Sequence, residues 1–258
     1  MKLQGYTGRN TIKIFNHIIG LHALIFQIFR IAFKKLESED KKKAKKEMAN
    51  QIYHTGIGGL PIILSASLIF GSALVFQFIK ISHQYDIGKL TILLICLELS
   101  PIITAFIIIM RSASSMTLEI TYLNGLGKLN SIIKAKKNPF ALICFPKFAG
   151  MTISFMCLTV IFNIVAIVGS YIVILILTET QSNDFLEQIV ASFTLNDIIV
   201  ASIKPICFGM ATAAICIFRG LKNYKRRNQI FANASGSAVE SFFYCIIINI
   251  VISINYYI

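Results

Sequence analysis

Ionisable side chains inside apolar stretches are the residues of this sequence best suited to chemistry. Glu98 and Lys204 each stand alone within a long run that holds no other charge. A charge inside a bilayer costs at least about 2.5–3.5 kcal/mol and usually faces a partner or a cavity. Both residues are therefore predicted to have an internal polar role. Arg111 and Glu119 lie about two helical turns apart at one end of the Glu98 stretch. They fit either charges that reach the membrane interface or internal groups on one helix face.

Known enzyme and metal motifs do not accompany these charges. The sequence contains no GxxxxGK[ST] nucleotide loop, no GxSxG, no HExxH and no paired carboxylates. Gly56, Gly58 and Gly59 precede Leu60-Pro61 and are interpreted as packing glycines at the start of a helix, not as a phosphate-binding loop. The 6 cysteines and 4 histidines are scattered without the spacing of metal ligands. They predict neither a disulfide framework nor a zinc site.

The elements that position the charges follow from composition. The 258 residues are 55% hydrophobic and only 14% charged, with a mean hydropathy of +0.71. Soluble domains carry about a quarter charged residues. The net charge of +13 would suit a nucleic-acid-binding protein, but not together with this hydrophobicity. The composition indicates an all-α membrane protein that crosses the bilayer several times.

Five stretches are long enough to cross a bilayer core, which takes about 20 helical residues. They are Thr55–Ile79, Leu90–Met110, Phe148–Thr178, Ile198–Phe218 and Ser241–Ile258. An earlier run, Ile14–Phe33, mixes apolar residues at helical spacing with polar ones and predicts an amphipathic helix at the membrane interface. A signal peptide is the rival interpretation of this run, but no small-residue cleavage site follows it. The expected organisation is an N-terminal segment, residues 1–50, and a five-span domain, residues 51–258.

The distribution of lysine and arginine predicts the orientation. Basic segments occupy Lys34–Lys46, Lys128–Lys147 and Arg219–Arg227, whereas Lys80–Lys89 is close to neutral and Glu179–Asp197 has no basic residue. Basic and non-basic segments therefore alternate across the five spans. Cytoplasmic loops carry the excess of Lys and Arg, so the N-terminus is predicted in the cytoplasm and the C-terminus on the opposite side.

Two motifs in the second span resemble those of the MlaE family of permease subunits in bacterial ABC transporters. ELSPIITA at 98–105 and MRSASSMTLE at 110–119 are similar to the family's RELGPVxxA and GRxGSAxxAE, and PKFAG at 146–150 is similar to its PRxxAG. The resemblance covers nearly the whole chain. The matching motif residues are Pro101, Arg111, Ser114, Glu119, Pro139 and Pro146.

The resemblance implies a lipid transporter. It implies a homodimer in a bacterial inner membrane, two cytoplasmic ABC ATPase subunits, and an MCE-domain protein on the opposite face. A phospholipid would lie between the two permease subunits, ATP would act through the partner ATPase, and this chain would bind no cofactor. A coupling helix between spans two and three would dock into the ATPase, and its residues are Leu126, Gly127, Lys128 and Leu129. The residues expected to contact lipid on the first span are Leu74, Gln77 and Phe78.

The sequence departs from the family pattern at three places. Leu97 replaces the arginine before the motif glutamate, so Glu98 lacks a neighbouring cation. The glutamate usual in the coupling helix is absent around Gly127-Lys128, which predicts an acidic groove in the partner ATPase. Glu240, expected at the start of the fifth span, occupies a position that is basic in the family. We therefore expect Glu240 to pair with Lys204.

Two other classes of function are compatible with the residues. An intramembrane lipid-modifying enzyme would use Glu98, Arg111 and Lys204 together, without an ATPase. A structural anchor for an MCE protein would assemble with its partner without needing Glu98 or Lys204.

Overall fold

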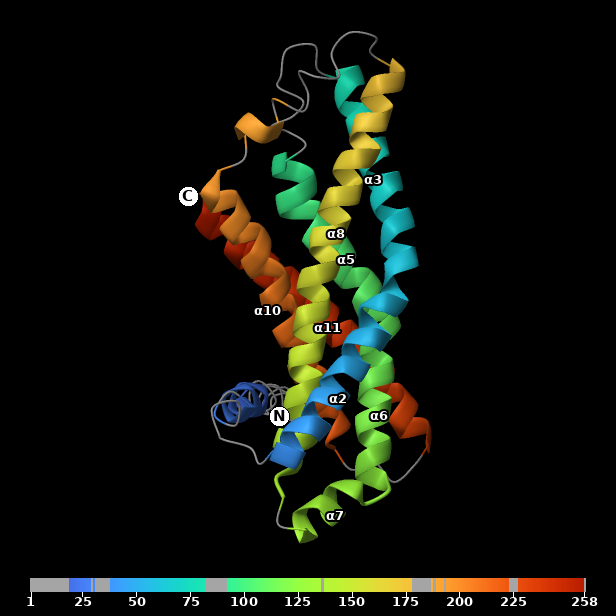
Figure 1. The fold of residues 1–258 in the computed structure, drawn as a ribbon, viewed down its shortest axis with the longest axis vertical. Coiled ribbons are helices and arrows are strands. Elements are labelled where there is room, and N and C mark those ends of the chain that lie inside the picture. Colours follow the sequence, from blue (N-terminus) through green and yellow to red (C-terminus); the bar gives the residue numbers. More distant parts are fainter. Residues whose placement is uncertain are drawn as a thin grey trace, which may run out of the picture.

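Helices form all the regular structure in the described part of the chain. The computed structural model describes residues 19–28, 30, 38–81, 92–135, 137–177, 187, 189–192, 194–222 and 227–257. Five helical runs are long and apolar enough to cross a membrane: Asp40–Phe78, Leu94–Gly125, Phe140–Ile176, Leu195–Gly220 and Asn228–Tyr256. They form one elongated bundle (Figure 1). The prediction of an all-α membrane protein with five spans is confirmed.

A short apolar helix, Ile19–Ile28, precedes the spans. Leu21, Leu24 and Ile28 are buried, whereas Phe26 is 72% exposed, so the helix packs one face against the protein and leaves apolar side chains exposed on the other. The rest of the predicted range, apart from Arg30, lies outside the described residues. The location of this helix at the membrane interface stays a prediction.

The first span begins well before its apolar residues. The polar helix α2 (Ser38–Thr55) leads through the short 3-10 turn η1 (Ile57–Gly59) into the apolar α3 (Leu60–Ile81). One face of α2 packs on α8, where Gln51 and Thr55 are buried and hydrogen-bonded to each other. The predicted boundary at residue 50 falls inside α2.

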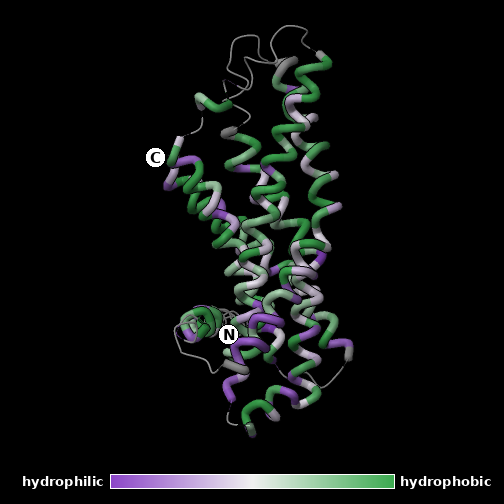
Figure 2. The backbone as a smooth tube through the Cα atoms, in the orientation of Figure 1, coloured by the Kyte–Doolittle hydropathy of each residue, from purple (hydrophilic) through white to green (hydrophobic). Residues whose placement is uncertain are grey.

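The second span is one continuous helical run made of four segments. These are the π-helical η2 (Ile92–Leu99), α5 (Ser100–Ile108), the π-helical η3 (Ile109–Ala113) and α6 (Ser114–Gly125). A turn at Leu126-Gly127 then leads into the short helix α7 (Lys128–Lys134), which lies beyond the end of the bundle (Figure 1). The predicted helix between spans two and three is therefore present. Figure 2 shows hydrophilic residues gathered at this same end, along α2, α6 and α7.

The third span is the centre of the bundle. It consists of the π-helical η4 (Phe140–Cys144) and α8 (Phe145–Leu177), and α2, α3 and α10 (Leu195–Gly220) all pack against α8. α11 (Arg227–Tyr257) runs back along α10. The core holds large buried side chains from α8 and α10, including Phe155, Phe162 and Phe208.

Several helices extend beyond the apolar stretches from which they were predicted. α6 continues to Gly125 instead of ending near Met110, η4 starts at Phe140 instead of Phe148, and α11 starts at Arg227 instead of Ser241. Glu240 therefore lies well inside α11, not at the start of the fifth span. Residues 82–89, 179–186, 188 and 193 of the two predicted loops lie outside the described residues, as do Lys34 and Lys35.

Candidate functional site

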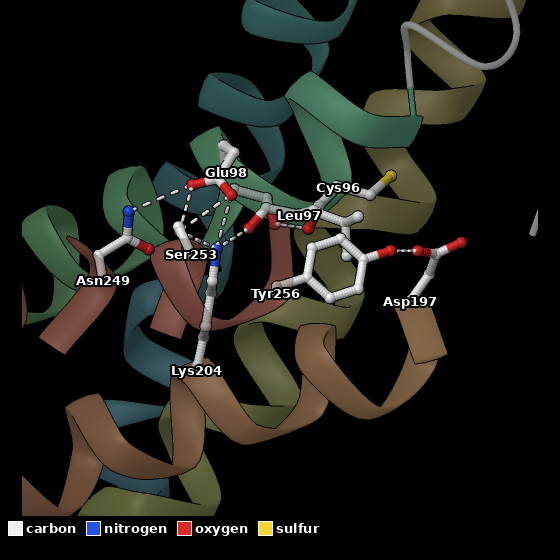
Figure 3. Close-up of polar contacts among 9 residues, drawn as sticks. Cys96, Leu97, Glu98, Asp197, Lys204, Asn249, Ser253 and Tyr256 are labelled. Atoms are coloured by element: carbon white, nitrogen blue, oxygen red, sulfur yellow. Dashed lines mark hydrogen bonds and ion pairs between the residues drawn. The ribbon is translucent and has the colours of Figure 1, made fainter. Parts of the chain in front are cut away.

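Lys204 and Glu98 form an ion pair between α10 and η2. Lys204 is fully buried, and its Nζ lies 2.9 Å from Glu98 Oε1. The same Nζ donates to the carbonyl oxygen of Leu97 at 2.8 Å and to Ser253 Oγ at 2.9 Å. An ammonium group has three N–H donors, so Lys204 is fully satisfied by these three acceptors (Figure 3).

Glu98 is the more accessible partner, with 22% of its side chain exposed. Ser253 Oγ lies 2.9 Å from Glu98 Oε2, and Asn249 Nδ2 donates to the same oxygen at 3.2 Å. The carboxylate is thus held by groups from α10 and α11 and still has an open side (Figure 3). We name Glu98, Lys204, Asn249 and Ser253 the Glu98 cluster.

The local sequence explains how Lys204 reaches the backbone of span two. In an α-helix the carbonyl of Leu97 would accept a hydrogen bond from the N–H of residue 101, but Pro101 has no N–H. Lys204 donates to that carbonyl. Local π-helical turns occur often at functional sites, and η2, which carries Glu98, is one of them.

Next to this cluster, Asp197 joins the ends of α10 and α11. It forms a capping box with Thr194 at the start of α10, and its Oδ1 accepts a hydrogen bond from Tyr256. Capping satisfies backbone N–H groups at a helix start. Asp197 was counted as a loop acid in the sequence, and the structure shows it as a buried structural group, 3% exposed.

The expected pairing of Glu240 with Lys204 is wrong. Glu240 Oε2 lies 2.5 Å from Arg219 Nε, and Lys204 pairs with Glu98. The reason is the register of the antiparallel pair α10–α11, in which Lys204 lies opposite Ser253. Glu240 is about 20 Å from Ser253 along α11 at 1.5 Å per residue. Although Leu97 stands where the family has an arginine, Glu98 still has a cation as its partner. That cation is Lys204 of α10.

Arg111 and Glu119 lie toward the α7 end of span two, away from Glu98. Arg111 Nη1 donates to the carbonyl oxygen of His54 at 2.8 Å, and Glu119 Oε2 lies 2.6 Å from Lys147 Nζ. The two residues therefore hold α2 and α8 against span two. Both residues have partners on other helices, while Glu119 is 47% exposed, so both interpretations from sequence stay predictions.

The remaining motif residues have structural positions. Pro101 is buried at the start of α5, Ser114 is half-buried at the start of α6, and Pro139 and Pro146 are buried at the starts of η4 and α8. Proline is favoured in the first turn of a helix. These residues shape the helix junctions.

Leu74, Gln77 and Phe78 lie on α3, which packs along α8. Leu74 and Phe78 are half-buried and Gln77 is exposed. The hydrogen bonds of the described residues do not connect this group with the Glu98 cluster. In the predicted coupling segment, Leu126 and Lys128 are exposed and Leu129 is buried, so this segment presents apolar and basic groups beyond the bundle.

Sequence reasoning missed Asn249 and Ser253. Both are polar residues on an otherwise apolar span, one helical turn apart on one face. That spacing is the signal that could have found them. Among the described residues, no group of three His, Cys, Asp or Glu side chains lies close enough together to hold a metal ion.

Comparisons with known proteins agree with this architecture. The family model "Permease MlaE" matches residues 48–255. The chain is 28% identical over 178 residues to the intermembrane phospholipid transport system permease protein MlaE of Haemophilus influenzae, covering 67% of this chain and 68% of that protein. It is 21% identical to a probable ABC transporter permease protein of Rickettsia typhi over 98% of this chain and 97% of the relative. A probable ABC transporter permease protein of Porphyra purpurea is 28% identical over 67% of this chain and 68% of that protein. Because the family model spans most of the chain, all five membrane-crossing helices included, this protein belongs to the MlaE permease family.

Proposed function

We propose that this ABC transporter permease subunit moves phospholipid, or a related lipid, between two membranes. The observation that carries the proposal is the Glu98 cluster, a partly exposed carboxylate held by a fully buried lysine within apolar spans. Ionisable groups in a membrane segment usually mark a transport pathway or a functional partner. A relative from Haemophilus influenzae carries the name of an intermembrane phospholipid transport permease, which supports lipid as the cargo.

The proposed assembly follows the same reasoning. Permeases of ABC transporters use ATP through partner ATPase subunits. We propose two copies of this chain, two ATPase subunits at the α7 end, and an MCE-domain protein at the other end. The three basic segments support an inner-membrane orientation with the N-terminus and α7 in the cytoplasm and the C-terminus in the periplasm. Leu74, Gln77 and Phe78 on α3 are proposed to contact the lipid tails.

Bound lipid is the most direct test. The chain is co-expressed with an ABC ATPase and an MCE-domain protein from the same organism, purified in detergent, and examined by native mass spectrometry. We expect a complex that contains two permease copies and retains phospholipid. Its ATPase activity is expected to rise when phospholipid is added. A complex with neither bound lipid nor lipid-stimulated ATPase activity contradicts the proposal.

The same preparation separates the two alternative functions. The enzyme alternative requires Glu98, Arg111 and Lys204 to act together, but Arg111 lies about 20 Å from Glu98 along span two. It predicts a modified lipid without the ATPase. The anchor alternative predicts that Glu98→Gln leaves both assembly and lipid retention unchanged.

The turn before α7 provides a prediction on coupling. Gly127 has φ +70°, a backbone conformation that β-branched residues adopt at a cost of about 1–3 kcal/mol and that Asn tolerates. Gly127→Val is therefore expected to displace α7 and lower lipid-stimulated ATPase activity severalfold. Gly127→Asn is the matched control and is expected to retain most of that activity. A Cβ at Gly127 would meet nothing within 4 Å, so the two variants differ in backbone strain and not in a steric clash. Equal ATPase activity of the two variants would mean that α7 does not couple to the ATPase.

A further inference from the structure

A cavity lined by polar residues lies toward the α7 end of the bundle, away from the Glu98 cluster. Its volume is about 410 Å³, and it is enclosed by α2, by η3 and α6, and by the first turn of α8. Nine of the ten lining residues have polar or charged side chains, and the ten are Asn50, Gln51, His54, Thr55, Arg111, Ser112, Ser115, Met116, Glu119 and Lys147. Nothing in the proposed lipid pathway uses this space.

The charges around the cavity leave an excess of one positive charge. Arg111 and Lys147 contribute two positive charges and Glu119 contributes one negative charge, so with neutral His54 the sum is +1. Lys147 is only 2% exposed, although it carries a full charge. A buried charge is stable only when it is paired and hydrogen-bonded, so the partners of Lys147 decide what this site requires.

Lys147 has fewer partners than the other buried lysine. The Nζ of Lys204 has three acceptors. In the described part of the chain, the Nζ of Lys147 has one, Glu119 Oε2 at 2.6 Å. Because an ammonium group has three N–H donors, two donors of Lys147 remain for another acceptor. Arg111 shows the same surplus, since only its Nη1 donates to acceptors of the described residues, the carbonyls of His54 and Thr55.

Gly58 lies directly against the guanidinium of Arg111. A Cβ on Gly58, in η1, would meet the end of the Arg111 side chain, so a larger residue at this position would displace the guanidinium. Arg111 lies between the α2 carbonyls and the cavity, and its Nε donates to no acceptor among the described residues.

We propose that this cavity binds a phosphate-type oxyanion, the group common to a phospholipid headgroup and to inorganic phosphate. Such an anion accepts several charge-assisted hydrogen bonds, which arginine and lysine supply. A phosphodiester with one negative charge balances the +1 of the site. Ser112 and His54 offer further polar contacts on the cavity wall. The site is separate from the Glu98 cluster and does not depend on which lipid the transporter moves.

The test measures binding to the full chain, purified with its ATPase partner in a phosphate-free maltoside detergent. Isothermal titration uses two probes, inorganic phosphate and short-chain dihexanoyl phosphatidylglycerol, with a neutral short-chain glycolipid as the blank. Lys147→Met removes the buried donor and is expected to weaken probe binding about tenfold. Glu119→Gln removes the competing carboxylate and raises the charge of the site to +2, so it is expected to tighten binding about threefold.

The opposite signs distinguish a binding site from a purely structural ion pair, which both substitutions would merely break. Lys134→Met on α7 is the matched control, because it removes an exposed lysine outside the cavity and is expected to leave probe affinity unchanged. If Lys147→Met does not fold, Glu119→Gln alone decides. If the lipid probe binds and inorganic phosphate does not, the ligand is a lipid headgroup. If both probes bind equally, the ligand is free phosphate. No binding of either probe, or equal affinity in Glu119→Gln and Lys134→Met, overturns the proposal.

Discussion

Lys204→Met is expected to destabilise the permease by about 3–5 kcal/mol and to abolish transport. Lys204 is the only cation in contact with Glu98 among the described residues, and it also donates to Leu97 and Ser253. Methionine retains the shape of the side chain but leaves a carboxylate inside the bundle without its counter-ion. The expected result is a clearly lower melting temperature of the detergent-purified complex, together with loss of lipid-stimulated ATPase activity.

A double-mutant cycle separates the ion pair from other effects of the substitution. Glu98→Gln/Lys204→Met removes both charges and is expected to be more stable than Lys204→Met alone, because no unpaired charge remains. Glu240→Gln serves as the control, since Glu240 pairs with Arg219 and its effect should add to that of Lys204→Met. The opposite result would be additive stability effects of Glu98→Gln and Lys204→Met together with coupled effects of Glu240→Gln and Lys204→Met. It would support the pairing of Glu240 with Lys204 that the structure contradicts.

The number of spans could be predicted because it depends on composition alone. A run of about 20 apolar residues crosses a bilayer whatever its neighbours are, and all five predicted stretches lie within or overlap membrane-crossing helices. The motif residues could also be found, because Pro101 and Arg111 follow one another at a spacing that the family shares.

The ends of the spans could not be predicted in the same way. The prediction stopped each stretch at its first charges, at Arg111 in span two and at Lys147 in span three. In the structure these charges have partners from other helices, the His54 carbonyl for Arg111 and Glu119 for Lys147. A paired charge does not end a helix, and pairing between distant segments is invisible in a single sequence.

The partner of Lys204 required knowledge of register. α11 begins at Arg227, and its first residues are polar, so hydropathy did not indicate a membrane helix that extends this far. With the start placed near Ser241, the pairing of Glu240 with Lys204 rested on the exchange at a position that is basic in the family. The true start brings Ser253 opposite Lys204 and Glu240 opposite Arg219. A shift in the start of one helix therefore changed the predicted site.

Gly71→Ala is expected to destabilise the protein by about 3 kcal/mol or more. A Cβ at Gly71 would lie 2.2 Å from the backbone oxygen of Ala166 on α8. Overpacking a close contact costs about 1–3 kcal/mol when side chains can move, but here the obstacle is backbone. The only relief is to separate α3 from α8, which also breaks the hydrogen bond from Ser170 Oγ to the Gly71 carbonyl, 3.1 Å long. Purification yield and thermal melting in detergent measure the effect.

Gly125→Ala is the matched control for this prediction. Gly125 lies at the end of α6, and a Cβ there would meet nothing within 4 Å. Alanine is a better helix former than glycine by about 1 kcal/mol, so Gly125→Ala is expected to be neutral or slightly stabilising. The same substitution should therefore have opposite consequences at two positions of one chain. If Gly71→Ala melts like Gly125→Ala, spans one and three do not cross at Gly71 as closely as the structure shows.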